Sequence, residues 1–465
     1  MSPSAAVRPI DADAGTDVTS GIEHRPVRAV GLWGGLSANV LNMVGIGPFI
    51  TIPLALAAMG GPQALLGWLT GALLCICDGL VWAELGSQMP RSGGPYHYLQ
   101  QGFGAARLGR MLSFLYLWQS LIIGPLSIAS GTVGFAQYAQ YLLPQMGSTH
   151  IVAMAAGLCL LNTALLYRPV RSIQRISMVI AAIVLASCVW IVISGAFHFD
   201  ARIAFDFPAG AFAPSQGFWM GLGAATLIAV YDYGGYNNVC MIGEEIRNPR
   251  QVIPRAVLLS IMLVAILYLC LNLSIIGVLP WRTAQHSTAI VAEFMQSIYG
   301  QWGGIAVAVL ILIASWGSAL AVLLGMSRVP YAAAADGRFF KPFATLHPTG
   351  RFPTVSLLVM GALSALACLF SLADLISVMI VIQTLFQFIA QCVAVVLLRR
   401  RNPHADGFRM PLYPLPVLIA VAGWLYIVVT GQLRHIALAA GVLALGIGIY
   451  LLQARSRREW PFIAS

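Results

Sequence analysis

The sequence predicts an all-α protein that crosses a membrane many times. Of its 465 residues, 59% are hydrophobic and only 9% are charged, whereas a soluble domain carries about 25% charged residues. The hydrophobic residues form long runs, many of them at least as long as the roughly 20 residues with which an α-helix crosses a bilayer. A transmembrane β-barrel is excluded, because its strands alternate apolar and polar residues.

Twelve apolar segments follow a polar N-terminal tail, residues 1–28, which lacks the apolar core of a signal peptide. Each segment predicts one transmembrane helix that contacts the lipid bilayer. The segments are 29–58, 62–88, 108–143, 149–167, 172–197, 216–243, 254–280, 302–333, 353–371, 373–398, 414–431 and 434–453. Residues 29–400 therefore form a core of ten helices, 401–453 add helices 11 and 12, and 454–465 form a second tail.

Two shorter segments have the composition of helices at the membrane surface. Residues 95–104 are rich in aromatic side chains and are expected on the inner side. Residues 283–299 are amphipathic and contain Glu293, and are expected in an outer loop.

The arginines predict the orientation, because positively charged residues gather in cytoplasmic loops. With the N-terminus inside, only Arg202, Arg282 and Arg434 fall on outer connections. The inner connections then hold the clusters Arg168/Arg171/Arg175, Arg247/Arg250/Arg255, Arg399/Arg400/Arg401 and Arg455/Arg457/Arg458. We expect a multi-pass protein of the cell (inner) membrane with both termini cytoplasmic. The net charge of +10 is a topology signal, so no nucleic-acid partner is predicted.

Two of the twelve segments are not ordinary helices. Val44-Gly45-Ile46-Gly47-Pro48 interrupts the first, and Tyr231-Asp232-Tyr233-Gly234-Gly235-Tyr236-Asn237 interrupts the sixth. Glycine allows the chain to unwind, and proline removes a backbone donor. Unwound backbone inside a membrane is tolerated only where it is buried or lines a cavity. Breaks at matching positions of two five-helix halves indicate a substrate site at the midplane. Close helix packing at glycine is the alternative.

The residues around these breaks resemble the amino acid–polyamine–organocation transporter superfamily. The resemblance runs in order over about residues 29–400, and it includes the L-type amino acid transporter and plant polyamine-uptake branches. It rests on Gly45-Ile46-Gly47-Pro48-Phe49, Ala83-Glu84-Leu85, Pro90-Arg91-Ser92-Gly93-Gly94-Pro95-Tyr96, Tyr231 to Asn237, Gly243-Glu244-Glu245-Ile246-Arg247-Asn248-Pro249 and Ala335-Asp336-Gly337.

The resemblance implies a five-plus-five inverted repeat (LeuT-like) with two extra helices, which works by alternating access. It also implies that the amides of the first break hold a substrate carboxylate and that the second break supplies the amine side, with Tyr231 as an aromatic gate. Free N–H groups at a helix N-terminus favour an anion independently of the resemblance. The expected substrate-binding residues are Val44, Gly45, Ile46, Gly47, Phe49, Tyr231, Asp232, Gly234, Tyr236 and Asn237.

Asp232 and Asp78 are the candidates for ion coupling. A carboxylate in mid-membrane is costly, so it is protonated, paired with a cation or paired with substrate. Asp232 could instead cap the helix that restarts after the break. Asp78 has an equally good interpretation as a packing residue. Because the only lysine is Lys341, in a predicted cytoplasmic loop, a coupling mechanism based on lysine is excluded.

Charged residues at the predicted inner ends of spans 2 and 6 are candidates for an inner gate, or for structural ion pairs at the interface. They are Glu84, Arg91, Glu244, Glu245 and Arg247. Gln383, Gln387 and Gln391 recur every four residues in span 10. This polar stripe either lines the cavity or joins helices.

The function expected is secondary active transport of amino acids, by proton-coupled symport or exchange. The alternatives are transport of polyamines or organic cations, for which Asp232 binds ammonium, and sodium-coupled symport, for which Ser315 and Ser318 face the first break. No phosphate-binding Gly-rich loop with lysine occurs, and no catalytic set of side chains assembles, so an enzyme is not predicted. We expect no cofactor and no metal site. No outer loop carries a cysteine, so no disulfide-linked accessory subunit is expected.

Overall fold

The computed structural model describes residues 28–91, 93–104, 107–167, 173–335, 337, 339–348 and 352–462. The predicted tail up to residue 27 and the last three residues of the second tail lie outside the described residues. So do Ser92, Arg168, Arg171 and Asp336, which the sequence analysis used.

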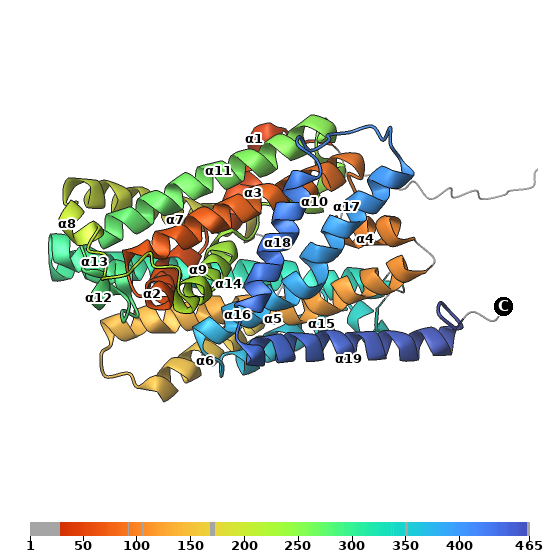
Figure 1. Ribbon diagram of the computed structural model, residues 1–465. Helices are drawn as coiled ribbons and strands as arrows, with labels where there is room; N and C mark the ends of the chain where they lie inside the picture. The colour runs from red at the N-terminus through yellow and green to blue at the C-terminus, as the bar shows by residue number, and fades with distance from the viewer. Residues whose placement is uncertain are drawn as a thin grey trace, which may run out of the picture.

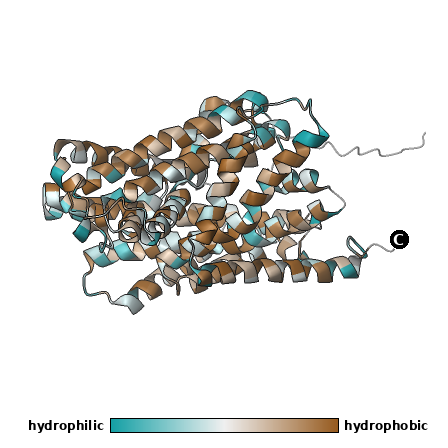
Figure 2. Ribbon diagram, in the orientation of Figure 1, coloured by the Kyte–Doolittle hydropathy of each residue, from teal (hydrophilic) through white to brown (hydrophobic). Residues whose placement is uncertain are grey.

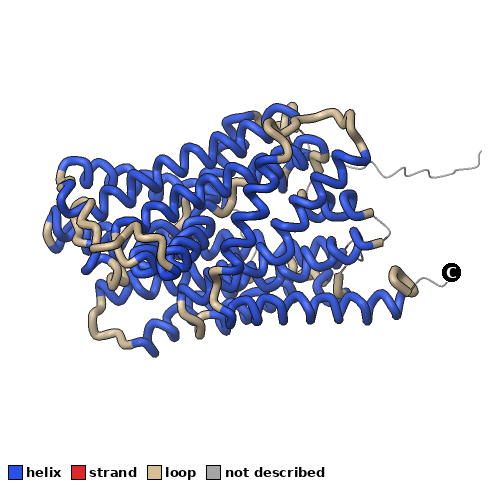
Figure 3. The backbone as a smooth tube through the Cα atoms, in the orientation of Figure 1, coloured by secondary structure: helices blue, strands red, loops and turns tan. Residues whose placement is uncertain are grey.

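The described chain consists of helices and loops, with two isolated backbone bridges (Figure 3). Up to the second break the helices are α1 (Leu32–Met43), α2 (Gly47–Met59), η1 (Pro62–Ala64), α3 (Leu65–Gln88), α4 (Pro95–Phe103), α5 (Leu108–Leu142), α6 (Ser148–Leu166), α7 (Ile173–Phe197), α8 (Ala201–Ala204) and α9 (Gln216–Tyr233).

The helices from the second break onward are α10 (Asn238–Met241), η2 (Gly243–Glu245), α11 (Pro249–Ile276), α12 (Trp281–Ala284), α13 (Ile290–Tyr299), α14 (Gln301–Ala335), η3 (Lys341–Ala344), α15 (Thr354–Ala367), α16 (Leu372–Gln383), η4 (Thr384–Phe388), α17 (Ile389–Arg401), α18 (Leu415–Val429) and α19 (Leu433–Arg457). All of them are α-helices or short 3₁₀-helices except η4, which is a π-helical turn.

Seven helical stretches among the described residues are long and apolar enough to cross a membrane. They are Pro62–Gln88, Leu108–Leu142, Ser148–Leu166, Pro249–Ile276, Gln301–Ala335, Leu372–Arg401 and Leu433–Ser456. The pair α1 and α2, bent by 51°, makes an eighth. Hydrophobic residues cover the length of the helices, and hydrophilic residues gather at their ends (Figure 2). The described chain is therefore helical, as expected for a multi-pass membrane protein, while the number of twelve spans stays a prediction.

Proline and glycine set several helix ends, as their backbone chemistry requires. Pro48, Pro62 and Pro249 each stand in the first turn of a helix, where the missing N–H would have had no acceptor. Gly60 ends α2 in a left-handed conformation, with φ 65°. The Ser371 side chain caps α16 by accepting from the Asp374 N–H, 3.2 Å away.

The two interrupted segments lie next to each other inside the bundle. α2 packs on α9, α1 packs on α11, and α3 packs along both α9 and α11. The long helices α5 and α14 pack along each other, and α19 runs along one edge (Figure 1). This packing brings two stretches of unwound chain, nearly 190 residues apart in sequence, into one central region.

The two predicted surface helices are both present, as α4 and α13. α4 packs on α5 and α17. α13 packs on α14, and its residues Ile290, Val291 and Phe294 are fully buried. Of the predicted segment 283–299, residues 290–299 therefore form a helix whose apolar face lies against the bundle, while 285–289 form a turn after α12.

Candidate functional site

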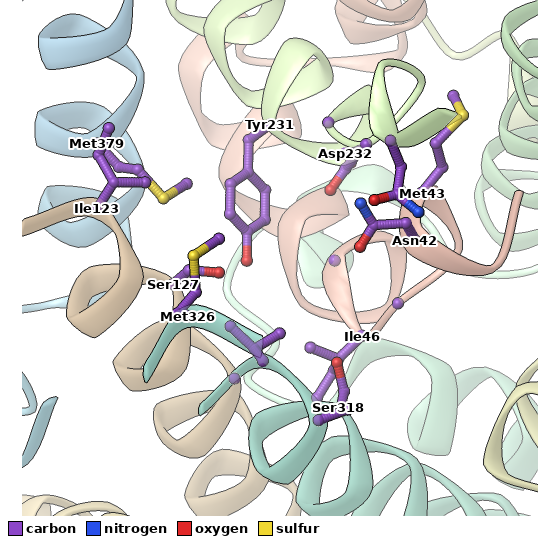
Figure 4. A pocket seen from close by; sticks show the side chains of 18 of the residues that line it. Asn42, Met43, Ile46, Ile123, Ser127, Tyr231, Asp232, Ser318, Met326 and Met379 are labelled. Atoms are coloured by element: carbon purple, nitrogen blue, oxygen red, sulfur yellow. The ribbon is translucent and has the colours of Figure 1, made fainter. Parts of the chain in front are cut away.

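A cavity of about 490 Å³ lies between the two breaks. Its walls come from the α1–α2 break, α5, α7, the α9–α10 break, α14 and the continuous stretch of α16 and η4. Figure 4 shows Tyr231 in its middle, with Met379 and Ser127 on one side and Asp232 and Asn42 on the other. Helices from both halves of the chain thus enclose one space.

Eight of the ten predicted substrate-binding residues line this cavity. They are Val44, Gly45, Ile46, Gly47, Tyr231, Asp232, Gly234 and Asn237. The other two are buried behind it: Phe49 is 1% exposed and Tyr236 is 3% exposed. Among the lining residues in the described part of the chain there is no Lys, Arg or His, and Asp232 is the one carboxylate.

The first break puts a helix N-terminus on the cavity wall. Val44, Gly45 and Ile46 are not helical, and α2 begins at Gly47 with Pro48 next. As the first residue of α2, Gly47 has no acceptor for its N–H within the helix. The dipole of the thirteen-residue α2 adds partial positive charge here. An anionic group in the cavity would be stabilised at this point.

The Asp232 carboxylate lies beside that N-terminus. A Cβ atom added to Gly47 would come 2.6 Å from Asp232 Oδ1, so only glycine leaves room for the carboxylate. Asp232 is 2% exposed, and its Oδ1 has no hydrogen-bond partner among the described residues. Its Oδ2 lies 2.7 Å from Thr51 Oγ1. This side-chain bond goes to α2, and α10 has no side-chain cap, so the geometry does not support the predicted role of Asp232 as a cap of the restarted helix.

The Thr51 hydroxyl has two acceptors and one proton. It lies 3.0 Å from Gly47 O and 2.7 Å from Asp232 Oδ2. If Asp232 is ionised, Thr51 can satisfy only one of these oxygens. If Asp232 is protonated, its O–H donates to Thr51, and Thr51 donates to Gly47 O. Both forms can satisfy these groups, because the Gly47 carbonyl, in the first turn of α2, also accepts the helical N–H of Thr51.

Side chains from neighbouring helices hold the two breaks together. The Tyr268 hydroxyl of α11 lies 2.8 Å from Met43 O and 3.3 Å from Asp232 O. Asn39 of α1 donates to Tyr236 O (2.5 Å) and accepts from the Val239 N–H (2.8 Å). These bonds satisfy backbone groups that unwinding leaves without helical partners.

Gly235 allows the closest approach between the breaks. Its φ is 113°, and a Cβ there would meet Asn42 Nδ2 at 2.9 Å. Both the backbone conformation and the contact exclude a larger residue.

Asp78, the second coupling candidate, does not line the cavity. It is fully buried in α3, where Oδ2 accepts from the Tyr236 hydroxyl (2.6 Å) and Oδ1 accepts from the Trp424 indole N–H (3.1 Å). Asp78 therefore connects the second break to α18 through two neutral donors.

The predicted inner-gate residues differ in their surroundings. Glu84 is fully buried and makes a bidentate pair with Arg399 (2.6 and 2.5 Å), a residue outside the predicted set. Its Oε2 also accepts from the Met410 N–H at 2.9 Å. Arg91 is exposed, and Glu244 and Glu245 lie half-buried in η2. Arg247 donates through Nε to Arg28 O, 3.1 Å away, and through its backbone N–H to Val30 O.

Sequence reasoning missed several residues that shape the site. Four methionines, Met43, Met241, Met326 and Met379, line the cavity and give it a deformable apolar wall. Thr51, Tyr268 and Asn39 had no local signal, because their partners are more than 180 residues away or belong to unwound backbone. Of the glutamine stripe, Gln383 and Gln387 line the cavity while Gln391 is buried elsewhere.

Comparison with known proteins gives one consistent result. The family model described as "Amino acid permease" matches residues 31–450. Cationic amino acid transporter 4 of Mus musculus is 28% identical over 386 residues, which cover 79% of this chain and 59% of the mouse protein. The chain therefore spans less than two thirds of that relative.

Two bacterial relatives match over nearly their full length. The serine/threonine exchanger SteT of Bacillus subtilis is 26% identical over 86% of this chain and 90% of its own. The branched-chain amino acid permease BcaP of the same organism is 24% identical, over 91% of this chain and 94% of BcaP.

Proposed function

Because this chain belongs to the amino acid permease family, within the amino acid–polyamine–organocation superfamily, we propose that it carries amino acids across the cell membrane by alternating access. The family makes it a multi-pass membrane transporter and not an enzyme. The proposal includes twelve spans, a five-plus-five inverted repeat and cytoplasmic termini, as the sequence predicts.

The facing breaks are the observation that carries this function. The N-terminus of α2 offers N–H groups to a substrate carboxylate, and the C-terminal end of α9 offers carbonyls to its amine. A free amino acid carries a carboxylate and an ammonium group close together, so it can meet the N–H groups of α2 and the carbonyls of α9 at the same time. The volume of about 490 Å³ is in the range of small-molecule sites.

We assign Asp232 as the carrier of a coupled proton. Its Oδ1 lies at the N-terminus of α2, where the substrate carboxylate would also bind. Two ionised carboxylates there would repel each other in a medium of low dielectric constant. A protonated Asp232 is supported by its burial and by a cavity wall whose described residues include no basic side chain. Binding of a zwitterion is therefore linked to uptake of one proton.

A polyamine or organic cation is the second candidate substrate. It is favoured by the unpartnered, buried Asp232 Oδ1 in a cavity wall without basic side chains. Such a substrate lacks a carboxylate, and an ionised Asp232 would bind its ammonium group directly. The sodium alternative has less support: Ser318 lines the cavity near Gly45, but the Ser315 hydroxyl donates to Ile311 O, 2.6 Å away.

The substrate is identified by competition uptake in proteoliposomes. The panel contains cationic, hydroxylated and branched-chain amino acids, the classes named for the three relatives, together with polyamines. Each is measured at acidic and neutral outside pH, with and without sodium. We expect competition by amino acids, greater uptake at acidic pH and no effect of sodium. Competition by polyamines alone would replace the amino acid assignment, and a strict sodium requirement would contradict proton coupling.

A further inference from the structure

A π-helical turn shapes one wall of the substrate cavity. η4 (Thr384–Phe388) joins α16 to α17 and adds one residue to the helical repeat. π-turns are rare and occur frequently at functional sites. The segment Thr-Leu-Phe-Gln-Phe contains neither proline nor glycine, so its own sequence does not force the irregularity. Gln387 stands in this turn, lines the cavity and is 4% exposed.

Gln387 pairs with a second amide across the wall. Gln119 Nε2 of α5 donates to Gln387 Oε1 at 2.5 Å. Gln119 Oε1 is buried without a partner among the described residues. The Gln387 bond uses its oxygen, so its NH₂ group stays available to a ligand in the cavity. The pair thus presents one free acceptor and one free donor, and neither residue carries a charge.

An aromatic stack and a buried carboxylate support this turn from behind. Phe388, the next residue, stacks on Trp424 of α18 with ring centroids 4.1 Å apart and planes within 13°. The Trp424 indole N–H donates to Asp78 Oδ1, 3.1 Å away. Trp424 is fully buried and does not line the cavity. Its ring orientation is fixed by Asp78, and it in turn restrains Phe388 beside Gln387.

We propose that Gln119 and Gln387 form a subsite of the cavity that binds a hydroxyl or carboxamide group on the substrate side chain, with Trp424 as its positioning residue. This rests on the proposed function and adds the side-chain class that the site prefers. A buried donor and acceptor left unpaired by an apolar side chain disfavour that substrate, which is how such sites discriminate.

Matched substrate pairs test the subsite. Threonine and valine are nearly isosteric, as are glutamine and methionine, and each pair differs in one polar group. In proteoliposomes, wild type is expected to favour the polar member. Gln387→Leu should lower the ratio of kcat/KM for threonine over valine by about five- to tenfold, the loss of one hydrogen bond. The change should lie in the KM for threonine. Gln119→Leu removes the acceptor independently and should act in the same direction.

The positioning role has its own variant and control. Trp424→Phe keeps an aromatic ring for the stack but loses the N–H, and should raise the KM for threonine while kcat for valine stays within about twofold. Trp281→Phe in α12 is the matched control, because it loses an indole bond to Asp206 O (2.9 Å) and neither residue lines the cavity. It should leave the ratio unchanged.

Three outcomes overturn the proposal in different ways. Unchanged ratios in both glutamine variants, or an equal loss for all four substrates, would remove the subsite. An altered ratio in Gln387→Leu with a normal one in Trp424→Phe would remove only the positioning role. If the wild-type protein transports no amino acid, and no amino acid raises its melting temperature in detergent, the proposed function itself fails. The subsite then fails with it.

Discussion

At the scale of single residues, Asp232 determines what the cavity can bind. An ionised carboxylate here has an unpartnered oxygen and faces no basic side chain on the cavity wall in the described chain. A protonated one carries no charge in this buried position and can donate to the Thr51 hydroxyl, 2.7 Å away. Its charge state therefore decides whether the N-terminus of α2 is available to a substrate carboxylate.

Asp232→Asn is expected to make uptake independent of pH. In wild type, acidic medium increases the protonated fraction, so uptake should rise as the outside pH falls. Asparagine keeps the shape and the hydrogen-bonding capacity of the protonated form at every pH. Accumulation against a gradient should be lost, while exchange of internal for external substrate persists. The measurement is initial uptake and counterflow at acidic and neutral pH, for wild type beside the variant.

The same variant separates the competing interpretations. Identical pH profiles for wild type and Asp232→Asn would exclude proton transfer at this residue. A half-saturation concentration increased about tenfold or more at all pH values would instead indicate a charge-assisted bond to a substrate ammonium, which contributes roughly 1.5–3 kcal/mol.

Gly47→Ala is expected to abolish uptake. The added Cβ would lie 2.6 Å from Asp232 Oδ1 and 3.4 Å from the Tyr231 ring, so the carboxylate must move from the N-terminus of α2. Gly47→Leu should act more strongly. Gly325→Ala in α14 is the control, because its Cβ meets nothing within 4 Å. Normal uptake by Gly47→Ala would mean that substrate does not bind between the breaks.

At the scale of helical elements, the breaks depend on bonds from intact helices. Tyr268 of α11 reaches the carbonyls of both breaks with one hydroxyl. Because α11 also packs on α1 and α3, it fixes the unwound segments relative to each other.

Tyr268→Phe should therefore destabilise the protein without a large change in volume. The Met43 carbonyl loses its donor, which costs about 1–3 kcal/mol for a buried group. We expect a lower melting temperature in detergent and a partial recovery when substrate is added. Tyr426→Phe removes a hydroxyl that bonds Trp219 O at a partly exposed position and should have a smaller effect. Equal effects of the two variants would argue against a special role of Tyr268.

The elements themselves could be predicted well from the sequence, because their signals are local. The break predicted at residues 44–48 appears as a shorter gap, 44–46, between α1 and α2. The break predicted at 231–237 appears as the gap 234–237 between α9 and α10, with Tyr231, Asp232 and Tyr233 still helical at the end of α9. The apolar segment 62–88 begins and ends with η1 and α3, which together span Pro62 to Gln88. The segment 108–143 differs by one residue from α5, Leu108–Leu142. Helix ends follow from capping and composition, so neighbouring residues suffice to find them.

The contacts between elements could not be predicted in the same way. Trp424 and Asp78 are 346 residues apart, and Gln119 and Gln387 are 268 apart, so no spacing connects them. The glutamine stripe was interpreted with the period of an α-helix. A π-turn at 384–388 interrupts that period, and Gln391, which lies beyond it in α17, does not line the cavity.

At the scale of the whole molecule, one ion pair joins α3, α17 and the chain that follows it. Glu84 is fully buried, and the Arg399 side chain is 17% exposed. Arg399 also lies over the Tyr413 ring, 4.0 Å from its centroid. The pair thus fixes helices 10 and 11 of the predicted topology onto span 2.

Arg399→Met should be the most damaging change in this pair. It leaves Glu84 buried without its cation, which costs about 3–5 kcal/mol. The double variant with Glu84→Gln should recover most of the loss, because the amide still accepts from Met410. Unfolding in mixed micelles by added SDS measures both. Arg250→Met breaks an exposed pair with Asp406 and should cost at most about 1 kcal/mol. If the double variant does not recover stability, the unpaired Glu84 carboxylate is not the cause of the loss in Arg399→Met.

The Glu84–Arg399 pair also sets an order of events during biosynthesis. The two residues are 315 positions apart, and at about 5–20 residues per second the ribosome needs about 15 to 60 s to travel from one to the other. During this interval the nascent chain holds the Glu84 carboxylate, near the C-terminal end of α3, without the arginine that pairs with it. That carboxylate has to stay hydrated among the lipid headgroups, since entry into hydrocarbon is costly. We therefore expect α3 to reach its final depth only after α17 has been inserted, so that the end of the bundle that holds Glu84 closes late in biosynthesis.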